Sequence, residues 1–170
     1  SLGRMRERMG AVIETPSFYP FLTAEQNLEY YRLQRGIAGK DCVKEALRLV
    51  GLGDTRNKKF KNFSLGMKQR LGLALAILGS PDLLLLDEPI NGLDPMGIVQ
   101  FRDLLLRLNA ERQITILISS HILSEIANLA THYGFIDGGR MLQQIAARDI
   151  EECCRECLEL TVDDAPKAAV

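Results

Sequence analysis

The chain has 170 residues, of which 46% are hydrophobic and 25% are charged, and its formal net charge is −1. This composition is ordinary for a globular domain and excludes a wholly disordered chain. The near-neutral charge gives no support to nucleic-acid binding, and no apolar run approaches the roughly 18 residues that a membrane-spanning helix needs.

The first third of the chain predicts a strand followed by two helices. Gly10–Ile13 is an apolar run typical of a short buried strand. Thr23 and Gln26 are spaced as in a capping box, which predicts a helix from Thr23 to about Gly36. A second helix is predicted over Asp41–Val50.

The middle of the chain alternates helices with strongly apolar strands. Ser64 is a candidate cap for a helix over Leu65–Leu78, and Pro95 begins a later helix. Leu83–Asp87 and Ile114–Ile118 are unbroken apolar runs, which predicts strands buried on both faces. Such strands alternating with helices predict an α/β fold with a parallel sheet.

The last third predicts a hairpin and a helix that carries thiols. Tyr133–Asp137 and Arg140–Gln144 flank a Gly-Gly turn. Cys153, Cys154 and Cys157 lie close together, but a fourth zinc ligand and a second Cys-x-x-Cys pair are missing. Reduced thiols on a helix are therefore the preferred interpretation.

Candidate functional residues follow the two apolar strands. Ligands of parallel sheets bind beyond the carboxyl ends of the strands, where Asp87, Glu88 and His121 are expected to lie. Adjacent acids can hold Mg²⁺ and orient water, or they can simply be solvated. His121 taken alone could be only a structural residue at a helix entry, as a lone histidine usually is.

Two further segments also leave two interpretations open. Ser64 followed by Gly66 exposes N–H groups at a helix start, which favours a phosphate, but the same residues form an ordinary cap. Asn91–Asp94 is either a simple turn or part of a site. The order of these features along the chain favours a functional site over the structural interpretations.

In this order the segments resemble the motifs of ABC transporter ATP-binding subunits, over about Met9 to Gln144. The matches are Phe63–Met67 to the signature motif, Leu83–Asp87 to Walker B with Glu88 as catalytic glutamate, Asn91–Asp94 to the D-loop and Ser119–His121 to the switch histidine. The resemblance implies a P-loop NTPase-like parallel sheet with an inserted α-helical signature subdomain at about 23–79. It also implies a partial ATPase domain over 1–145, and 146–170 is then a C-terminal extension.

The resemblance further implies ATP and Mg²⁺ as cofactors, catalytic roles for Glu88 and His121, and roles in binding Mg²⁺ for Asp87 and Glu14. Asp87 holds Mg²⁺ through water, Glu88 is the general base and His121 contacts the γ-phosphate. Glu14 stands where the family's Q-loop glutamine touches Mg²⁺ and the attacking water. This Glu, with Phe18-Tyr19-Pro20 after it, resembles the bacitracin and lantibiotic export or immunity branch.

A second group of residues is implied to act across a dimer. The family works as a head-to-tail pair of ATP-binding subunits. Ser64 and Gly66 bind the γ-phosphate held by the opposite subunit, and Asp94 couples the two sites. Leu65 and Met67 depart from the usual Gly and Gln of the signature motif.

The phosphate-binding loop Gly-x-x-x-x-Gly-Lys-Ser/Thr does not occur in the chain. In the family this loop lies upstream of the Q-loop, so we expect a fragment that lacks the N-terminal strands. The resemblance orders the remaining strands as Gly10–Ile13, Leu83–Asp87 and Ile114–Ile118. We expect the chain alone to hydrolyse no ATP.

The resemblance predicts the ATPase subunit of an exporter for a peptide antibiotic or lantibiotic. The subunit would lie in the cytoplasm, at the inner face of the bacterial plasma membrane, bound to a transmembrane permease. Phe18, Tyr19 and Phe21 are candidate permease contacts, or they pack their own loop. The alternatives are a non-transport ABC ATPase that acts as a switch in translation or repair, and an inactive interaction fragment.

Overall fold

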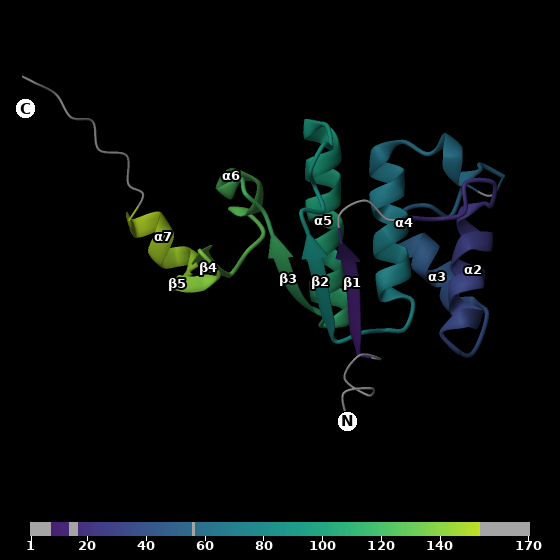
Figure 1. Ribbon diagram of the computed structural model, residues 1–170, viewed down its shortest axis with the longest axis horizontal. Coiled ribbons are helices and arrows are strands. Elements are labelled where there is room, and N and C mark those ends of the chain that lie inside the picture. Colours follow the sequence, from purple (N-terminus) through teal and green to yellow (C-terminus); the bar gives the residue numbers. More distant parts are fainter. Residues whose placement is uncertain (1–7, 14–16, 56, 154–170) are drawn as a thin grey trace, which may run out of the picture. The chain divides into compact units, whose positions relative to one another are not determined.

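The computed structural model describes residues 8–13, 17–55 and 57–153. The chain forms two compact units, which divide between Ile126 and Ala127. The first contains a parallel sheet with helices, and the second contains a hairpin and a helix (Figure 1). The division predicted at residue 145 stays a prediction. Within the described ranges, no helix is long and apolar enough to cross a membrane.

The first unit alternates strands with helices. Its elements are β1 (Met9–Ile13), α2 (Ala24–Gln34), α3 (Asp41–Leu49), the 3₁₀ turn η1 (Phe60–Asn62), α4 (Leu65–Ile77), β2 (Leu83–Asp87), α5 (Pro95–Arg112), β3 (Thr115–Ser119) and α6 (Leu123–Ile126). The second unit contains β4 (His132–Asp137), β5 (Arg140–Ala146) and α7 (Ala147–Cys153). The α/β fold class predicted from the sequence is confirmed.

Three parallel strands form the centre of the first unit, in the order β1-β2-β3 (Figure 1). The middle strand, β2, ends at Asp87, which pairs with Ile13 on one side and Ser119 on the other. The predicted strand order is therefore confirmed. Because the strands are parallel and in register, their carboxyl ends meet at one edge, where α/β sheets bind ligands.

The two faces of this sheet differ in burial. Leu84 and Leu86 of β2 are buried in a core to which α4 and α5 contribute. On the opposite face Ile13 is 70% exposed and Leu117 is 63% exposed. The prediction that the strands are buried on both faces is wrong for the described part of the chain, because its helices cover one face only.

Close approach of β1 to α4 requires a glycine in the strand. A Cβ atom at Gly10 would lie 2.3 Å from the carbonyl oxygen of Ala76. No side chain fits into that space without a backbone shift. Gly10 thus sets the distance at which the helix packs on the sheet.

The helix starts follow their predicted caps. The Thr23 hydroxyl accepts from the Gln26 N–H at 3.2 Å, and the Thr23 N–H donates to Gln26 Oε1 at 2.9 Å. This is the predicted capping box. Ser64 and Asp94 cap α4 and α5 in the same way, each by accepting a backbone N–H three residues on.

A buried amide holds the loop that precedes α2. Asn27 is fully buried, and its Oδ1 accepts from the Tyr19 N–H at 2.9 Å. Its Nδ2 donates to the carbonyl oxygens of Tyr19 at 3.2 Å and Thr23 at 2.9 Å. These bonds satisfy the amide and tie the loop to the helix start.

The second unit is an antiparallel hairpin of β4 and β5 followed by α7. Gly138 and Gly139 form its turn with φ values of 53° and 75°, which favour glycine. The predicted hairpin is confirmed. Cys153 ends α7, whereas Cys154 and Cys157 lie outside the described residues, so the interpretation as reduced thiols stays a prediction.

Candidate active site

Asp87 and Ser119 face each other at the carboxyl ends of β2 and β3. They are register partners, and the Ser119 hydroxyl donates to Asp87 Oδ1 at 2.6 Å. Hydrogen bonds to a carboxylate are short and strong because the acceptor carries charge. One oxygen of the predicted metal-binding carboxylate is therefore held by the neighbouring strand.

Glu88 follows directly in a backbone conformation that side-chain-bearing residues rarely adopt. Its φ is 44°, and its N–H donates to the same Ser119 hydroxyl at 3.0 Å. A left-handed non-glycine residue costs about 1–3 kcal/mol and persists only where its surroundings hold it. The Glu88 side chain is 29% exposed, which leaves it accessible from solvent.

His121 reaches the Glu88 carboxylate from the segment that follows β3. Its Nδ1 lies 3.0 Å from Glu88 Oε2, and its side chain is 63% exposed. The structure thus brings together Asp87, Glu88 and His121, as expected from their places after the strands. Two carboxylates and an imidazole at one edge can orient a water, accept its proton and contact an anion.

A second group of predicted residues surrounds the starts of α4 and α5. The Ser64 hydroxyl accepts from the Met67 N–H at 3.3 Å, and Asp94 Oδ1 accepts from the Gly97 N–H at 3.2 Å. A Cβ atom at Gly92 would lie 3.1 Å from the Leu65 side chain, and one at Gly66 would lie 3.7 Å from that of Leu93. The start of α4 therefore packs on the turn before α5.

Glu14, the remaining predicted site residue, lies outside the described residues. The residue before it, Ile13, ends β1 and pairs with Asp87. Its role in binding Mg²⁺ and water stays a prediction.

The aromatic loop splits into a packed and an exposed part. Phe18 is buried, with its ring centroid 5.2 Å from that of Phe60 and 5.7 Å from that of Tyr31. Tyr19 and Phe21 are exposed. The pKa of the Tyr19 phenol is raised, chiefly by a hydrogen bond with the Tyr30 side chain. Phe18 therefore packs the loop, as the alternative interpretation held, and Tyr19 and Phe21 remain candidate contacts.

Ser119 is a polar site residue to which sequence reasoning assigned no role. It belongs to the segment that resembles the switch-histidine motif, but only the histidine was given a function. The sequence offered only the position of Ser119 as a clue, because Ser119 ends a strand and the neighbouring strand ends in Asp87. That clue becomes specific only once the register is known.

The described residues contain no group of three or more His, Cys, Asp or Glu side chains placed to hold a metal ion. Mg²⁺ characteristically takes only one or two carboxylates, with phosphate oxygens and water as its other ligands. Asp87, which keeps Oδ2 clear of the Ser119 bond, fits such a site.

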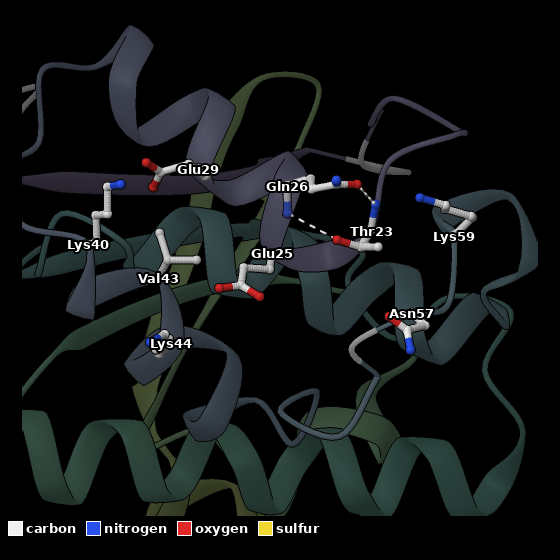
Figure 2. A pocket seen from close by; sticks show the side chains of 9 residues that line it. All are labelled: Thr23, Glu25, Gln26, Glu29, Lys40, Val43, Lys44, Asn57 and Lys59. Carbon is white, nitrogen blue, oxygen red and sulfur yellow. Dashed lines mark hydrogen bonds between the residues drawn. The ribbon is translucent and has the colours of Figure 1, made fainter.

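A hollow of the described surface lies elsewhere, between α2, α3 and the segment before η1 (Figure 2). It has a volume of about 800 Å³, and its lining includes Glu25, Glu29, Lys40, Lys44 and Lys59. The pKa of Glu29 is lowered because Arg32 donates hydrogen bonds to its carboxylate. None of the predicted site residues that the structure describes lines this hollow, so it is separate from the strand-end residues Asp87, Glu88 and His121.

Comparison with known proteins agrees with the motif order. Over 163 residues the chain is 48% identical to the bacitracin transport ATP-binding protein BcrA of Bacillus licheniformis, and this match covers 96% of the chain and 53% of BcrA. It is 44% identical to the lantibiotic transport ATP-binding protein SrtF of Streptococcus pyogenes, over 79% of the chain and 58% of SrtF. The chain thus spans about half the length of these curated relatives.

The fold has counterparts among solved structures as well. The structure of cbiO1 from Clostridium perfringens, part of the ABC transporter complex cbiONQ, superimposes with a TM-score of 0.79 at 25% identity. The match covers 89% of this chain and 62% of cbiO1. The family model described as ABC transporter matches residues 1–91. From the motif order, the shared fold and this match, we conclude that the chain belongs to the ABC transporter family.

Proposed function

We propose that the chain is the catalytic-glutamate part of the ATP-hydrolysing subunit of an ABC exporter for a peptide antibiotic, of the bacitracin or lantibiotic type. The observation that carries this proposal is the contact of His121 with Glu88, next to Asp87, at the carboxyl edge of the sheet. The relatives' names favour transport over a switch in translation or repair.

The strand-end residues divide the catalytic work. Glu88 acts as general base and accepts the proton of the attacking water. His121 orients the Glu88 carboxylate through Nδ1 and contacts the γ-phosphate of ATP. Asp87 holds Mg²⁺ through water, and Glu14 adds a second carboxylate. When bound, Mg²⁺ offsets the negative charge that the phosphates carry in the transition state.

The residues around α4 and α5 act on a second ATP-binding subunit in a head-to-tail dimer. Ser64 and Gly66 lie at the start of α4, where the helix dipole and backbone N–H groups favour an anion. In this proposal that anion is the γ-phosphate of the opposite subunit. Asp94, on the turn that packs against α4, couples the two sites.

A transmembrane permease is the second protein partner in this proposal, and the subunit bound to it would lie in the cytoplasm at the inner face of the bacterial membrane. Tyr19 and Phe21 supply exposed aromatic surface on a loop that Asn27 holds in place. Rigid exposed aromatic side chains are frequent anchors of protein interfaces.

Replacing the proposed base tests the catalytic assignment. In the full-length protein, Glu88→Gln keeps the side-chain shape but removes the base. We expect ATP turnover to fall by about 10²-fold or more while ATP binding persists. Glu111→Gln, an exposed position on α5, is the matched control. Turnover of the Glu88 variant within about threefold of wild type would show that the base lies elsewhere.

Replacing Tyr19 tests the permease surface. Tyr19→Ala should weaken co-purification of the full-length protein with its permease and leave the ATPase activity of the isolated subunit unchanged. Leu33→Ala serves as the control, because it removes an exposed apolar side chain near the C-terminal end of α2, away from the loop that carries Tyr19. Co-purification that is equally strong in both variants would contradict the interface assignment.

A further inference from the structure

We propose that Ser119 is a positioning residue for the ATPase reaction. Its hydroxyl orients the Asp87 carboxylate and, at the same time, holds the backbone of Glu88. This inference rests on the proposed function and adds to it a residue that acts through the two acids.

The first support is the double use of one hydroxyl. Ser119 Oγ donates its single proton to Asp87 Oδ1 at 2.6 Å and accepts the Glu88 N–H at 3.0 Å. A serine hydroxyl has one donor and two acceptor positions, so both bonds can form together. One side chain of β3 thus links two consecutive residues at the end of β2.

The second support is the conformation of Glu88. Its φ of 44° lies in the left-handed region, which a residue with a side chain enters only when neighbouring groups hold it there. The hydrogen bond from the Glu88 N–H to the Ser119 hydroxyl stabilises this conformation. The backbone held in this way places the Glu88 carboxylate beside His121 Nδ1.

The third support is the register of the two strands. Ser119 is the Cα partner of Asp87, whereas Thr115, on the same face of β3, pairs with Leu83 at the other end of the sheet. A hydroxyl therefore reaches the acids from position 119 and not from position 115. With Oδ1 held by Ser119, Oδ2 is the Asp87 oxygen that would serve the metal site.

The test compares three variants of the full-length protein. Ser119→Ala removes both bonds, Ser119→Thr keeps the hydroxyl, and Thr115→Ala removes a hydroxyl from the same strand away from the acids. Loss of a residue that orients metal ligands commonly costs 10–100-fold. We therefore expect Ser119→Ala to lower kcat for ATP about tenfold, with KM within about twofold. Ser119→Thr should recover most of the loss, and Thr115→Ala should behave as wild type.

A second readout does not depend on turnover. Binding of Mn²⁺ in the presence of ADP, followed by electron paramagnetic resonance, should weaken about tenfold in Ser119→Ala and recover in Ser119→Thr. A merely structural role would lower the urea midpoint and leave Mn²⁺ affinity unchanged in the folded protein. If Ser119→Ala does not fold, Ser119→Cys replaces it, because a thiol is a weak donor of similar size.

Wild-type kcat and Mn²⁺ affinity in Ser119→Ala would overturn the proposal, as would losses that Ser119→Thr fails to recover. The Glu88→Gln variant, measured in parallel, separates this outcome from failure of the proposed function. Near-normal turnover of Glu88→Gln contradicts the catalytic assignment, and the Mn²⁺ measurement then still decides whether Ser119 orients Asp87.

Discussion

The helical subdomain (α2 to α4) and the carboxyl edge of the sheet use polar side chains in opposite ways. In α2, Asn27 and Arg32 are buried, and their hydrogen bonds go to nearby backbone groups and to the Glu29 carboxylate. At the sheet edge, Glu88 and His121 are accessible and bond to groups from another strand or loop. Buried groups with local partners stabilise the fold, whereas accessible groups linked across strands remain able to meet a ligand.

Arg32 shows the first use in detail. Its Nε and Nη2 donate to the two carboxylate oxygens of Glu29 at 2.7 and 2.9 Å, and its Nη1 donates to the Ile37 carbonyl. The side chain therefore joins the end of α2 to the turn that follows. The Glu29 carboxylate compensates the charge of Arg32. The buried position of Arg32 is therefore explained without a bound anion.

The largest expected effect concerns the sheet edge. In the full-length protein, His121→Ala should lower ATP turnover by about 10²-fold, because loss of alignment at a reacting group has effects of that size. The urea midpoint should stay near that of wild type, since the side chain is exposed. His132→Ala, the other histidine of the chain, is the control. A lower urea midpoint with normal turnover in His121→Ala would mean that His121 stabilises the fold and does not act in the reaction, which would contradict the contrast between the two regions.

The next effect concerns stability in the helical subdomain. Asn27→Ala removes three hydrogen bonds and leaves the Tyr19 N–H without its partner, which should lower the free energy of unfolding by about 2 kcal/mol. Turnover per folded molecule should be unchanged. The exposed Asn62 offers a control as Asn62→Ala, and urea unfolding is the measurement. A stable Asn27 variant with impaired turnover would contradict the structural role.

The smallest effect is the pH dependence of the Glu29–Arg32 pair. Hydrogen bonds from Arg32 lower the pKa of Glu29 in the folded state. The pair therefore contributes stability above the pKa that Glu29 has in the unfolded chain, and this contribution is lost as pH falls through the folded pKa. Glu29→Gln should have a lower urea midpoint than wild type at pH 7, and this difference should vanish once the pH lies below the folded-state pKa of Glu29. A difference that persists in acid would exclude the ion pair as its source.

Much of the candidate site was predictable, because its acids and its histidine directly follow apolar runs. Asp87 is the last residue of β2, Glu88 follows it, and His121 comes two residues after the end of β3. Ser119 was not predictable in its role, since its two bonds depend on which residue of β2 it faces. The same holds for Asn27, whose partners include a loop eight residues upstream.

By itself the sequence determined the local features of this protein. The caps at Thr23, Ser64 and Asp94 and the Gly-Gly turn depend on residues within a few positions of each other, so their chemistry can be read along the chain. Only the tertiary structure decided which face of the sheet is buried and how the backbone turns at Glu88. Both depend on segments brought together from distant parts of the chain, since burial needs a covering helix and the left-handed Glu88 is held by Ser119 of the next strand.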